Sequence, residues 1–209
     1  MRLDTGMHIK VFNGKDGLYL AELVELSKKK GTAKLIQQLE PQSKNEYSLS
    51  LCFVPIKKDR QDFMIEKSVE LGVTDLYPLK SQHGQVSKVK AERFDAQIIE
   101  ACEQCERLTI PKLHPMMDLR QFLKSWPVEK KLYVCAERAD ARTIAYYAKA
   151  EKQDAAFLVG PEGGFSAEEM DLFDQYDFIH KITLGERILR AETAAVTALA
   201  SFWAVQSEV

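Results

Sequence analysis

Leu158-Val159-Gly160-Pro161-Glu162-Gly163-Gly164-Phe165-Ser166 joins a short apolar run to a polar segment, with three glycines and a proline between them. The apolar residues 155–159 predict a buried strand. Ser166, followed by Glu169 three positions later, is the capping-box pattern that begins a helix. We therefore expect a strand, a loop and a helix. Such a loop lies at the carboxyl end of a parallel strand, where open α/β sheets bind ligands.

The loop matches neither common nucleotide-binding signature. No Gly-Lys-Ser/Thr follows it, so it is not a Walker loop, and its spacing is not the GxGxxG of dinucleotide-binding proteins. Glycine lets a ligand approach the backbone closely. A tight strand-to-helix connection has the same composition, so from the residues alone both interpretations stay open.

A second segment, residues 184–194, reads Leu-Gly-Glu-Arg-Ile-Leu-Arg-Ala-Glu-Thr-Ala. It predicts a strand end, a glycine turn and charged residues where the last helix, 191–205, begins. One interpretation is a charged site. The other is an ordinary connection, because Glu192 at a helix start is favourable for the helix dipole and Arg187 is then simply solvated.

The sequence pattern changes between residues 1–45 and residues 46–209. The boundary lies in the polar stretch 41–46, which begins with a proline. The first part is expected to hold three short strands, at 7–12, 18–26 and 32–39, too few to close a barrel. The second alternates strands with helices, which predicts an α/β domain with a largely parallel sheet. Its expected strands are 47–55, 75–79, 132–136, 155–159 and 182–184, and its expected helices are 60–71, 89–108, 143–151, 166–176 and 191–205.

Composition excludes several classes. The chain has 209 residues, 45% of them hydrophobic, and a formal net charge of −2, so it is neither disordered nor a strongly basic nucleic-acid coat protein. Cys102 and Cys105 form one CxxC without a second pair or paired histidines, so no metal site is expected. No signal peptide is visible, and the apolar run 194–205 is too short to span a bilayer. We expect a soluble, cytoplasmic protein without a membrane partner.

Four motifs in order resemble one family. The pair GPEGGF-S-x-E-E and LG-x-R-I-L-R-x-E-T-A is similar to the signature of the SPOUT methyltransferases, and its spacing resembles the RsmE type, which methylates uridine N3 in ribosomal RNA. Residues 66–73, Glu-Lys-Ser-Val-Glu-Leu-Gly-Val, are similar to the K-x-x-E-L-G-V helix of that family. Residues 100–107, Glu-Ala-Cys-Glu-Gln-Cys-Glu-Arg, are similar to its E-A-x-E-Q-x-x-R segment. The resemblance covers residues 5–205.

The resemblance implies a fold that periodicity does not reveal. It implies a SPOUT domain with a C-terminal trefoil knot, preceded by a truncated PUA-like β-barrel module for RNA recognition, and a homodimer. It also implies S-adenosylmethionine as the cofactor, bound in the knot by backbone and apolar side chains. The strand that ends at residues 135–137 would supply a third side of this pocket. The implied cofactor-binding residues are Leu158, Gly160, Pro161, Gly163, Gly164, Leu184, Gly185, Ile188 and Leu189.

The same resemblance implies catalytic roles for three charged residues. Arg190 would stabilise negative charge on the uracil ring. Glu192 or Glu162 would hold Arg190 in place or act as the base, and the sequence does not choose between them. Small-subunit ribosomal RNA, free or in the 30S subunit, would be the partner, contacted by Gln104, Arg107, Lys57 and Lys67, with Lys58 and Arg60 as further candidates for phosphate.

Residues 81–84, Ser-Gln-His-Gly, depart from the family pattern, which has an E-R-S/T stretch there, and His83 is expected to be incidental. Two other functions stay open. One is a SPOUT ribose 2′-O-methyltransferase acting on tRNA or rRNA, against which the E-L-G-V and E-Q-x-x-R segments argue. The other is a non-catalytic RNA-binding or assembly factor. A nucleotide-binding α/β protein is disfavoured because neither a Walker lysine nor a metal-binding carboxylate pattern is present.

Overall fold

The computed structural model describes residues 3–28, 30–136, 141–147 and 154–207. The chain divides into two compact units. The smaller comprises Met1–Asn45 and Glu106–Ile110, and the larger comprises Glu46–Cys105 and Pro111–Val209.

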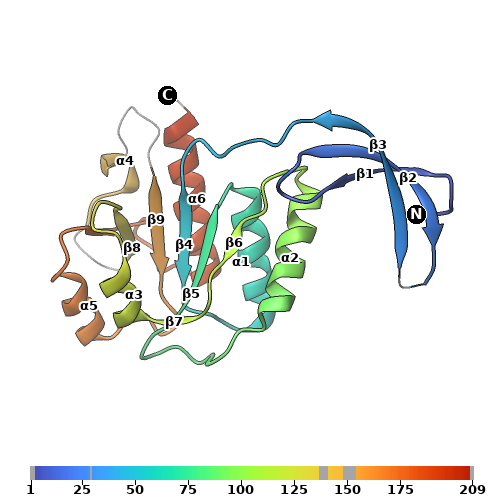
Figure 1. Cartoon of the computed structure of the whole chain (residues 1–209). Coiled ribbons are helices and arrows are strands. Elements are labelled where there is room, and N and C mark those ends of the chain that lie inside the picture. The colour runs from blue at the N-terminus through green and yellow to red at the C-terminus, as the bar shows by residue number, and fades with distance from the viewer. Residues whose placement is uncertain (1–2, 29, 137–140, 148–153, 208–209) are drawn as a thin grey trace. The chain divides into compact units, whose positions relative to one another are not determined.

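Three antiparallel strands in the order β1-β2-β3 form the smaller unit (Figure 1). They are β1 (His8–Phe12), β2 (Leu18–Leu26) and β3 (Gly31–Glu40), and they confirm the three predicted strands to within one residue at each end. Ala21 and Leu23 of β2 are buried, whereas β3 is exposed along its whole length. The segment 106–110 belongs to this unit because the Gln42 amide donates to the Leu108 carbonyl at 3.2 Å.

The larger unit contains a parallel sheet in the order β10-β8-β9-β4-β5-β6, with β7 paired to β5 (Figure 1). Its two central strands, β4 and β9, are completely buried, as expected for a sheet covered on both faces. The strands are β4 (Leu49–Phe53), β5 (Asp75–Lys80), β6 (Lys112–Leu113), β7 (Met117–Asp118), β8 (Leu132–Cys135), β9 (Ala155–Val159) and β10 (Ile179–Ile182).

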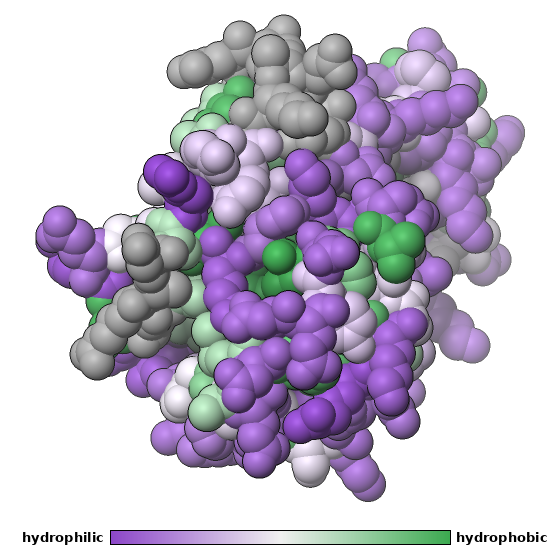
Figure 2. Space-filling model, turned by 90° about the vertical axis from the view of Figure 1, so that its left-hand side faces the viewer, coloured by the Kyte–Doolittle hydropathy of each residue, from purple (hydrophilic) through white to green (hydrophobic). Residues whose placement is uncertain are grey.

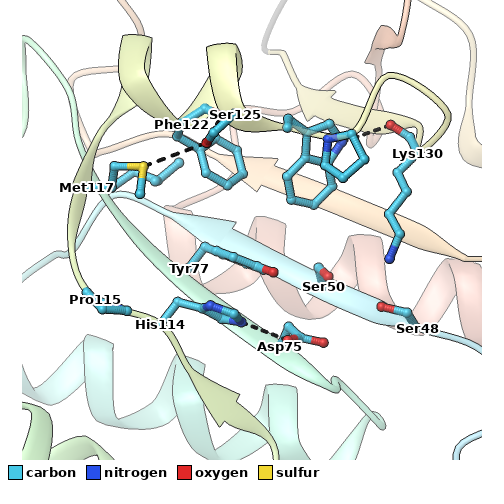
Figure 3. A pocket seen from close by; sticks show the side chains of 13 residues that line it. Ser48, Ser50, Asp75, Tyr77, His114, Pro115, Met117, Phe122, Ser125 and Lys130 are labelled. Atoms are coloured by element: carbon cyan, nitrogen blue, oxygen red, sulfur yellow. Dashed lines mark hydrogen bonds and ion pairs between the residues drawn. The ribbon is translucent and has the colours of Figure 1, made fainter.

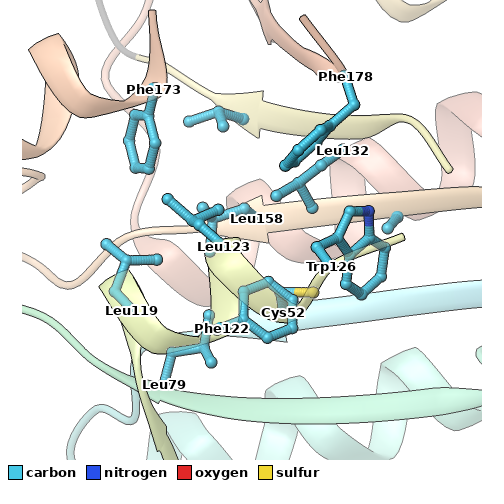
Figure 4. Close-up of a cluster of buried hydrophobic side chains, with 12 residues drawn as sticks. Cys52, Leu79, Leu119, Phe122, Leu123, Trp126, Leu132, Leu158, Phe173 and Phe178 are labelled. Carbon is cyan, nitrogen blue, oxygen red and sulfur yellow. The ribbon is translucent and has the colours of Figure 1, made fainter. Parts of the chain in front are cut away.

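Helices cover the two faces of this sheet. On one face, α3 (Leu119–Ser125) and α5 (Ala167–Phe173) bury Leu158 of β9 in a cluster with Phe122 and Phe173 (Figure 4). Alternate strand residues point to opposite faces, so Phe157 faces the other way and meets Phe202 with ring centroids 5.8 Å apart. Phe202 belongs to α6 (Ala191–Ser207), which packs against α1 (Lys58–Glu70) and β9, while α2 (Ala91–Gln104) packs on α1.

The structure corrects several predictions in the larger unit. The sequence reading missed β6, β7 and α3 altogether. The strand expected at 182–184 is β10, three residues earlier, because Ile179 pairs with Leu132 and Ile182 with Cys135. The helix expected at 89–108 ends at Gln104, and Glu106 adopts a left-handed conformation. The helix expected at 143–151 is α4 (Ile144–Tyr147), and residues 148–151 lie outside the described part.

Two further expectations depend on residues that the structure leaves undescribed. The trefoil knot stays a prediction, because residues 137–140 and 148–153 of the connection between β8 and β9 lie outside the described ranges. Residues 135–137 were expected to form a third side of the pocket, and Glu137 among them also lies outside the described ranges. Among the described residues, no helix has the length and apolar character needed to cross a membrane.

Candidate functional site

The predicted loop 160–164 leaves the carboxyl end of β9, beside the carboxyl end of β4. From β4 the chain continues to β5 on one side, whereas β9 leads through α5 to β10 on the other side, beyond β8. A crevice forms where neighbouring strands send their connections in opposite directions, and this is the usual ligand position in such sheets. The fold therefore places the loop at the expected location for a binding site.

Local contacts fix the shape of this loop. The Gly164 N–H donates to the Pro161 carbonyl at 2.9 Å, and Gly164 has a φ of +68°, a conformation that favours glycine. A Cβ added at Gly160 would lie 3.0 Å from the Phe165 ring, so this glycine permits close packing. The predicted capping box is confirmed: the Ser166 side chain accepts from the Glu169 N–H, and the Glu169 carboxylate accepts from the Ser166 N–H.

A segment distant in sequence is bound to the same loop. The Gln82 N–H donates to Oε1 of Glu169 at 2.9 Å, and the Nδ1 of His83 donates to the carbonyls of Gly163 and Gly164 at 3.3 and 3.1 Å. His83 was expected to be incidental, but its imidazole contacts the predicted loop directly. Motif spacing gave no signal for this contact, because β5 brings the segment to the loop only in the folded sheet.

The second predicted segment, 184–194, begins after β10 with an open glycine turn. Gly185 has a φ of +117°, and its N–H donates to the Thr183 hydroxyl at 3.2 Å. Ile188 is 55% exposed, and Leu184 and Leu189 are half-buried. By contrast, the side chain of Leu158 is buried in the core on the α3 face, so only its backbone could contact a ligand.

Arg60 of α1 links the two predicted carboxylates. Its Nη1 lies 2.6 Å from Oε1 of Glu162, and its Nε lies 3.8 Å from Oε1 of Glu192, a residue in the first turn of α6. Glu192 is only 9% exposed, and its Oε2 is buried without a hydrogen-bond partner among the described residues. Three segments of the chain therefore meet at this cluster of one guanidinium and two carboxylates.

This pairing adds a partner that was not predicted. Glu162 or Glu192 was expected to hold Arg190 in place or to act as the base, and in the described structure both carboxylates lie against Arg60. The Arg190 side chain is exposed, with no ion pair to a described residue. Arg60 had been considered only as a phosphate contact. Arg60 is one of several charged residues near the start of a predicted helix. That position does not distinguish an arginine that points into solvent from one that points toward the edge of the sheet.

The four predicted RNA contacts lie in different environments. Lys57 is exposed just before α1, and Lys67, on α1, pairs with Glu66 and Glu70 at 2.7 and 2.8 Å. These hydrogen bonds raise the pKa of Lys67 well above its usual value. Gln104 is exposed at the end of α2 in the larger unit. Arg107 lies in the smaller unit, where its Nε donates to the Thr109 hydroxyl at 2.8 Å.

One cysteine, Cys135, lies at the carboxyl edge of the sheet. Burial raises the pKa of Cys135, at the end of β8, to about 12, so its thiol stays neutral and is a poor nucleophile. Within the described ranges, no three His, Cys, Asp or Glu residues are grouped so as to hold a metal ion.

Comparisons with known protein families give two matches. Residues 43–203 match the RNA methyltransferase domain, and residues 1–36 match the RNA methyltransferase PUA domain. Among curated proteins, ribosomal RNA small subunit methyltransferase E of Rickettsia conorii is 34% identical over 204 residues. The alignment covers 96% of this chain and 82% of that protein.

Solved structures show the same relationship. The methyltransferase Lpg2936 from Legionella pneumophila, solved with bound S-adenosylmethionine, is 32% identical with a TM-score of 0.86. The match covers 97% of this chain and 84% of that one. The ribosomal RNA small subunit methyltransferase E from Neisseria gonorrhoeae, also bound to S-adenosylmethionine, is 30% identical with a TM-score of 0.80, covering 97% and 85%. The A. aeolicus TrmH/SpoU tRNA modifying enzyme, 11% identical with a TM-score of 0.50, shares the fold alone.

Proposed function

Because the chain belongs to the ribosomal RNA small subunit methyltransferase E family of RNA methyltransferases, we propose that it methylates N3 of a uridine in small-subunit (16S) ribosomal RNA, with S-adenosylmethionine as the methyl donor. The observation that carries this proposal is the carboxylate of Glu192. One of its oxygens faces Arg60 and the other is buried and unpaired at the carboxyl end of the sheet. Such an oxygen can accept a proton from a substrate.

The described residues fit S-adenosylmethionine in three ways. Among the described residues, and apart from the adjoining ones, no atom lies within 4 Å of the Cβ position at Gly164 or Gly185, so both turns leave room for a ligand against the backbone. Ile188 offers an exposed apolar surface to a flat adenine ring. Carboxylates nearby favour a positively charged sulfur. Leu158, Gly160, Pro161, Gly163, Leu184 and Leu189 complete the cofactor contacts in this proposal.

S-adenosylmethionine, when bound, supplies an electrophilic methyl group. The residues of the protein account for the other steps, which are proton removal, charge stabilisation and positioning. N3 of uridine carries a proton and is a weak nucleophile, so Oε2 of Glu192 takes that proton while Arg60 holds the other carboxylate oxygen in place. Glu192 is preferred to Glu162 because Glu162 is more exposed and its Oε1 is already bonded to Arg60.

Arg190 is exposed near this carboxylate in sequence and free of ion pairs within the described residues, so it can turn to a uracil oxygen and stabilise its negative charge. Holding N3 in line with the methyl carbon is the larger contribution, since positioning alone supplies about 7–11 kcal/mol. The target base must first leave its stack, which costs a few kcal/mol.

Recognition of the RNA is assigned to Lys57, Lys67, Gln104 and Arg107, together with the PUA-like unit. The substrate then is 16S ribosomal RNA or the 30S subunit, and the working compartment is the cytoplasm, which holds the ribosomal subunits. The family match and the exposed positions of Lys57 and Gln104 support this assignment.

A homodimer is the proposed assembly. Phe63 on α1 and Trp203 on α6 are 45% and 54% exposed, and aromatic side chains of this kind are enriched at protein interfaces. On the face that Figure 2 shows, viewed from the side of α4 and α5, hydrophobic residues instead form small patches between hydrophilic ones. Sedimentation equilibrium tests the assembly, and a monomer mass at micromolar concentration would contradict it.

The deciding experiment is transfer of radiolabelled methyl groups to small ribosomal subunits that lack the modification, followed by nucleoside analysis. The proposal requires labelled 3-methyluridine. A ribose-methylated nucleoside would instead support the 2′-O-methyltransferase, whose fold the TrmH structure shares. Stable binding to the subunits without any transfer, while S-adenosylmethionine still binds, would support the non-catalytic assembly factor.

A further inference from the structure

A cavity of about 330 Å³ lies in the larger unit, between α3 and the strands β4 and β5 (Figure 3). This volume is within the range of small-molecule pockets in proteins. None of its lining residues belongs to the candidate catalytic site. Neither the sequence motifs nor the proposed mechanism uses any of them.

Aromatic rings form one wall of this cavity. The Tyr77 ring stacks on His114 with centroids 3.8 Å apart, and it meets the rings of Phe122 and Trp126 at 5.5 and 5.7 Å. The cluster is rigidly held, since the Trp126 indole N–H donates to the Lys130 carbonyl at 2.8 Å. A fixed aromatic wall of this kind suits a flat ring that can stack on it.

Polar groups line the other end. Figure 3 shows Ser48 and Ser50 on the strand side of the space and the Lys130 side chain extending toward Ser48 from the segment that follows α3. Ser50 is only 4% exposed, and its side chain lines the cavity. Burial, with a smaller effect of Asp75, raises the pKa of the Tyr77 hydroxyl to about 12. It therefore remains a proton donor at neutral pH.

Hydroxyl groups that line a cavity can pair with a ligand or with water. The groups present both donate and accept: the hydroxyls do either, and the Lys130 ammonium only donates. The Asp75 carboxylate only accepts, and it already contacts His114 and the Thr74 hydroxyl through its two oxygens. The matching ligand has a flat ring with donors and acceptors along its edge. A sugar lacks the flat apolar face, and a purely apolar ring leaves the hydroxyls unpaired.

The cavity and the catalytic cluster lie toward opposite ends of the strands. Ser50 and Asp75 lie near the amino ends of β4 and β5, whereas Arg60, Glu162 and Glu192 gather past the carboxyl ends of β4 and β9. Strand residues advance about 3.3 Å each, so the two places are about 10 Å or more apart. A ligand in the cavity is thus a different group from the target base.

We propose that this cavity binds a second, unstacked nucleobase of the RNA substrate, with the ring against Tyr77 and Trp126 and its edge toward Ser50 and Asp75. Single-stranded RNA is commonly recognised by stacking bases on aromatic side chains. Lys112, opposite Asp75 in the sheet, is exposed and can attract the neighbouring phosphate. Lys130 can do so in part, since Asp154 lies 3.4 Å from it. The inference rests on the RNA methyltransferase activity proposed above.

The binding test uses the whole protein and the four nucleoside 5′-monophosphates. The chain has two tryptophans, so Trp203→Phe leaves Trp126 as the reporter. Saturating S-adenosylhomocysteine is added to block the cofactor site. At least one monophosphate is expected to quench the Trp126 fluorescence in a saturable manner, and Ser50→Val, which adds bulk inside the cavity, is expected to weaken that binding about tenfold. Absence of saturable quenching, or equal quenching in Ser50→Val, would overturn the proposal.

The kinetic test measures methyl transfer to small ribosomal subunits. Ser50→Val and Tyr77→Phe are expected to raise KM for the subunits about threefold to tenfold, the value of one lost hydrogen bond. The kcat and the affinity for S-adenosylmethionine are expected to stay unchanged. Tyr133→Phe is the matched control, because Tyr133 is buried in β8, outside the cavity, and its hydroxyl lacks a partner in the described structure. Its KM is expected to equal that of the unmodified protein.

The two proposals fail in different ways. If the unmodified protein transfers no methyl group to the subunits, the proposed function fails, while the fluorescence titration still decides whether the cavity binds a nucleobase. If transfer is normal and both cavity variants keep the KM of the unmodified protein, the second-base site is wrong and the methyltransferase proposal is unaffected. Urea unfolding of each variant shows whether a raised KM comes from lost stability.

Discussion

Arg60 and Glu162 form an ion pair, with Nη1 and Oε1 2.6 Å apart, and the same guanidinium lies 3.8 Å from Glu192. One side chain on α1 thus connects the loop after β9 to the beginning of α6. The Arg60 and Glu162 side chains are 37% and 33% exposed, so the pair adds at most about 1 kcal/mol of stability. Its main consequence is geometric, since it fixes where the two carboxylates lie.

Replacing Arg60 is expected to affect catalysis more than folding. In Arg60→Ala, Glu192 loses the group that holds its Oε1, so we expect kcat to fall about tenfold or more, while the free energy of unfolding changes by less than about 1 kcal/mol. Methyl transfer and urea unfolding are measured on the same preparation. Arg93→Ala is the matched control, because Arg93 also pairs with a carboxylate of α1, Asp62, away from the site. A loss of activity in the control as large as that in Arg60→Ala would contradict the positioning role.

The two carboxylates are expected to differ. Glu192→Gln removes the proposed proton acceptor, and general-base catalysis is worth about 10²- to 10⁴-fold, so kcat is expected to fall within that range. Glu162→Gln keeps a neutral partner for Arg60 and is expected to lose about tenfold or less. Single-turnover methyl transfer at saturating cofactor measures both. A larger loss in Glu162→Gln than in Glu192→Gln would transfer the role of base to Glu162.

Arg190 is assigned to the transition state, so its removal is expected to leave binding nearly intact. Arg190→Ala should abolish measurable transfer while the Kd for S-adenosylmethionine stays within about threefold, because the interaction forms only as charge develops on the base. Calorimetry gives the Kd and the radiolabel assay gives the rate. Parallel losses of affinity and rate would place Arg190 in the cofactor pocket instead.

Gly164 tests whether the loop needs its left-handed turn. Its φ of +68° is expensive for residues with a Cβ, so Gly164→Ala is expected to lower the free energy of unfolding by about 1–2 kcal/mol and to weaken cofactor binding. Asn tolerates this conformation better. Gly164→Asn is therefore the comparison, with a smaller loss of stability and of affinity. No described atom beyond the adjoining residues lies within 4 Å of the added Cβ, so a steric clash does not explain a difference. Equal effects of Ala and Asn would contradict the backbone argument.

His180 gives the fold a pH dependence whose sign is fixed. Burial, and to a lesser degree Lys131, lowers the pKa of His180 below its usual value of 6.5. As the pH falls through 6.5, the unfolded chain binds a proton that the folded protein resists, so the contribution present above pH 6.5 is lost toward the lower folded-state pKa. The urea midpoint is expected to fall between pH 7.5 and 5.5 more in the unmodified protein than in His180→Gln. Parallel curves for the two proteins would contradict this.

Strong local patterns predicted most of the fold. The capping box at Ser166 and the buried run 155–159 are decided by neighbouring residues, and the structure confirms both. The missed helix α3 also carried a usable signal: Asp118 caps it by accepting from the Arg120 and Gln121 N–H groups, ahead of apolar Leu119, Phe122 and Leu123. The short strand β10 could not be placed, because its position depends on pairing with β8, and pairing is not visible in a local window.

The candidate site, too, could be predicted only where local sequence patterns indicated its residues. The sequence motifs indicated both carboxylates, because they lie inside the two glycine-rich segments. The motifs did not reveal Arg60 or His83 as their neighbours, since each lies more than 75 residues from the loop that it contacts. The Ser50–Tyr77 cavity has no sequence signature either. It forms only because two adjacent strands and a helix surround it.

The Glu169 carboxylate completes the capping box of α5 and also accepts a hydrogen bond from the N–H of Gln82, 87 positions earlier in the chain. Hydrogen exchange at the Gln82 amide therefore requires the hydrogen bond to the Glu169 carboxylate to break. This requirement couples exchange at Gln82 to fraying of α5, although Gln82 is bound to that helix only through a side chain. Exchange at this single amide therefore reports on the cap of α5 and on the loop between β9 and α5 at once.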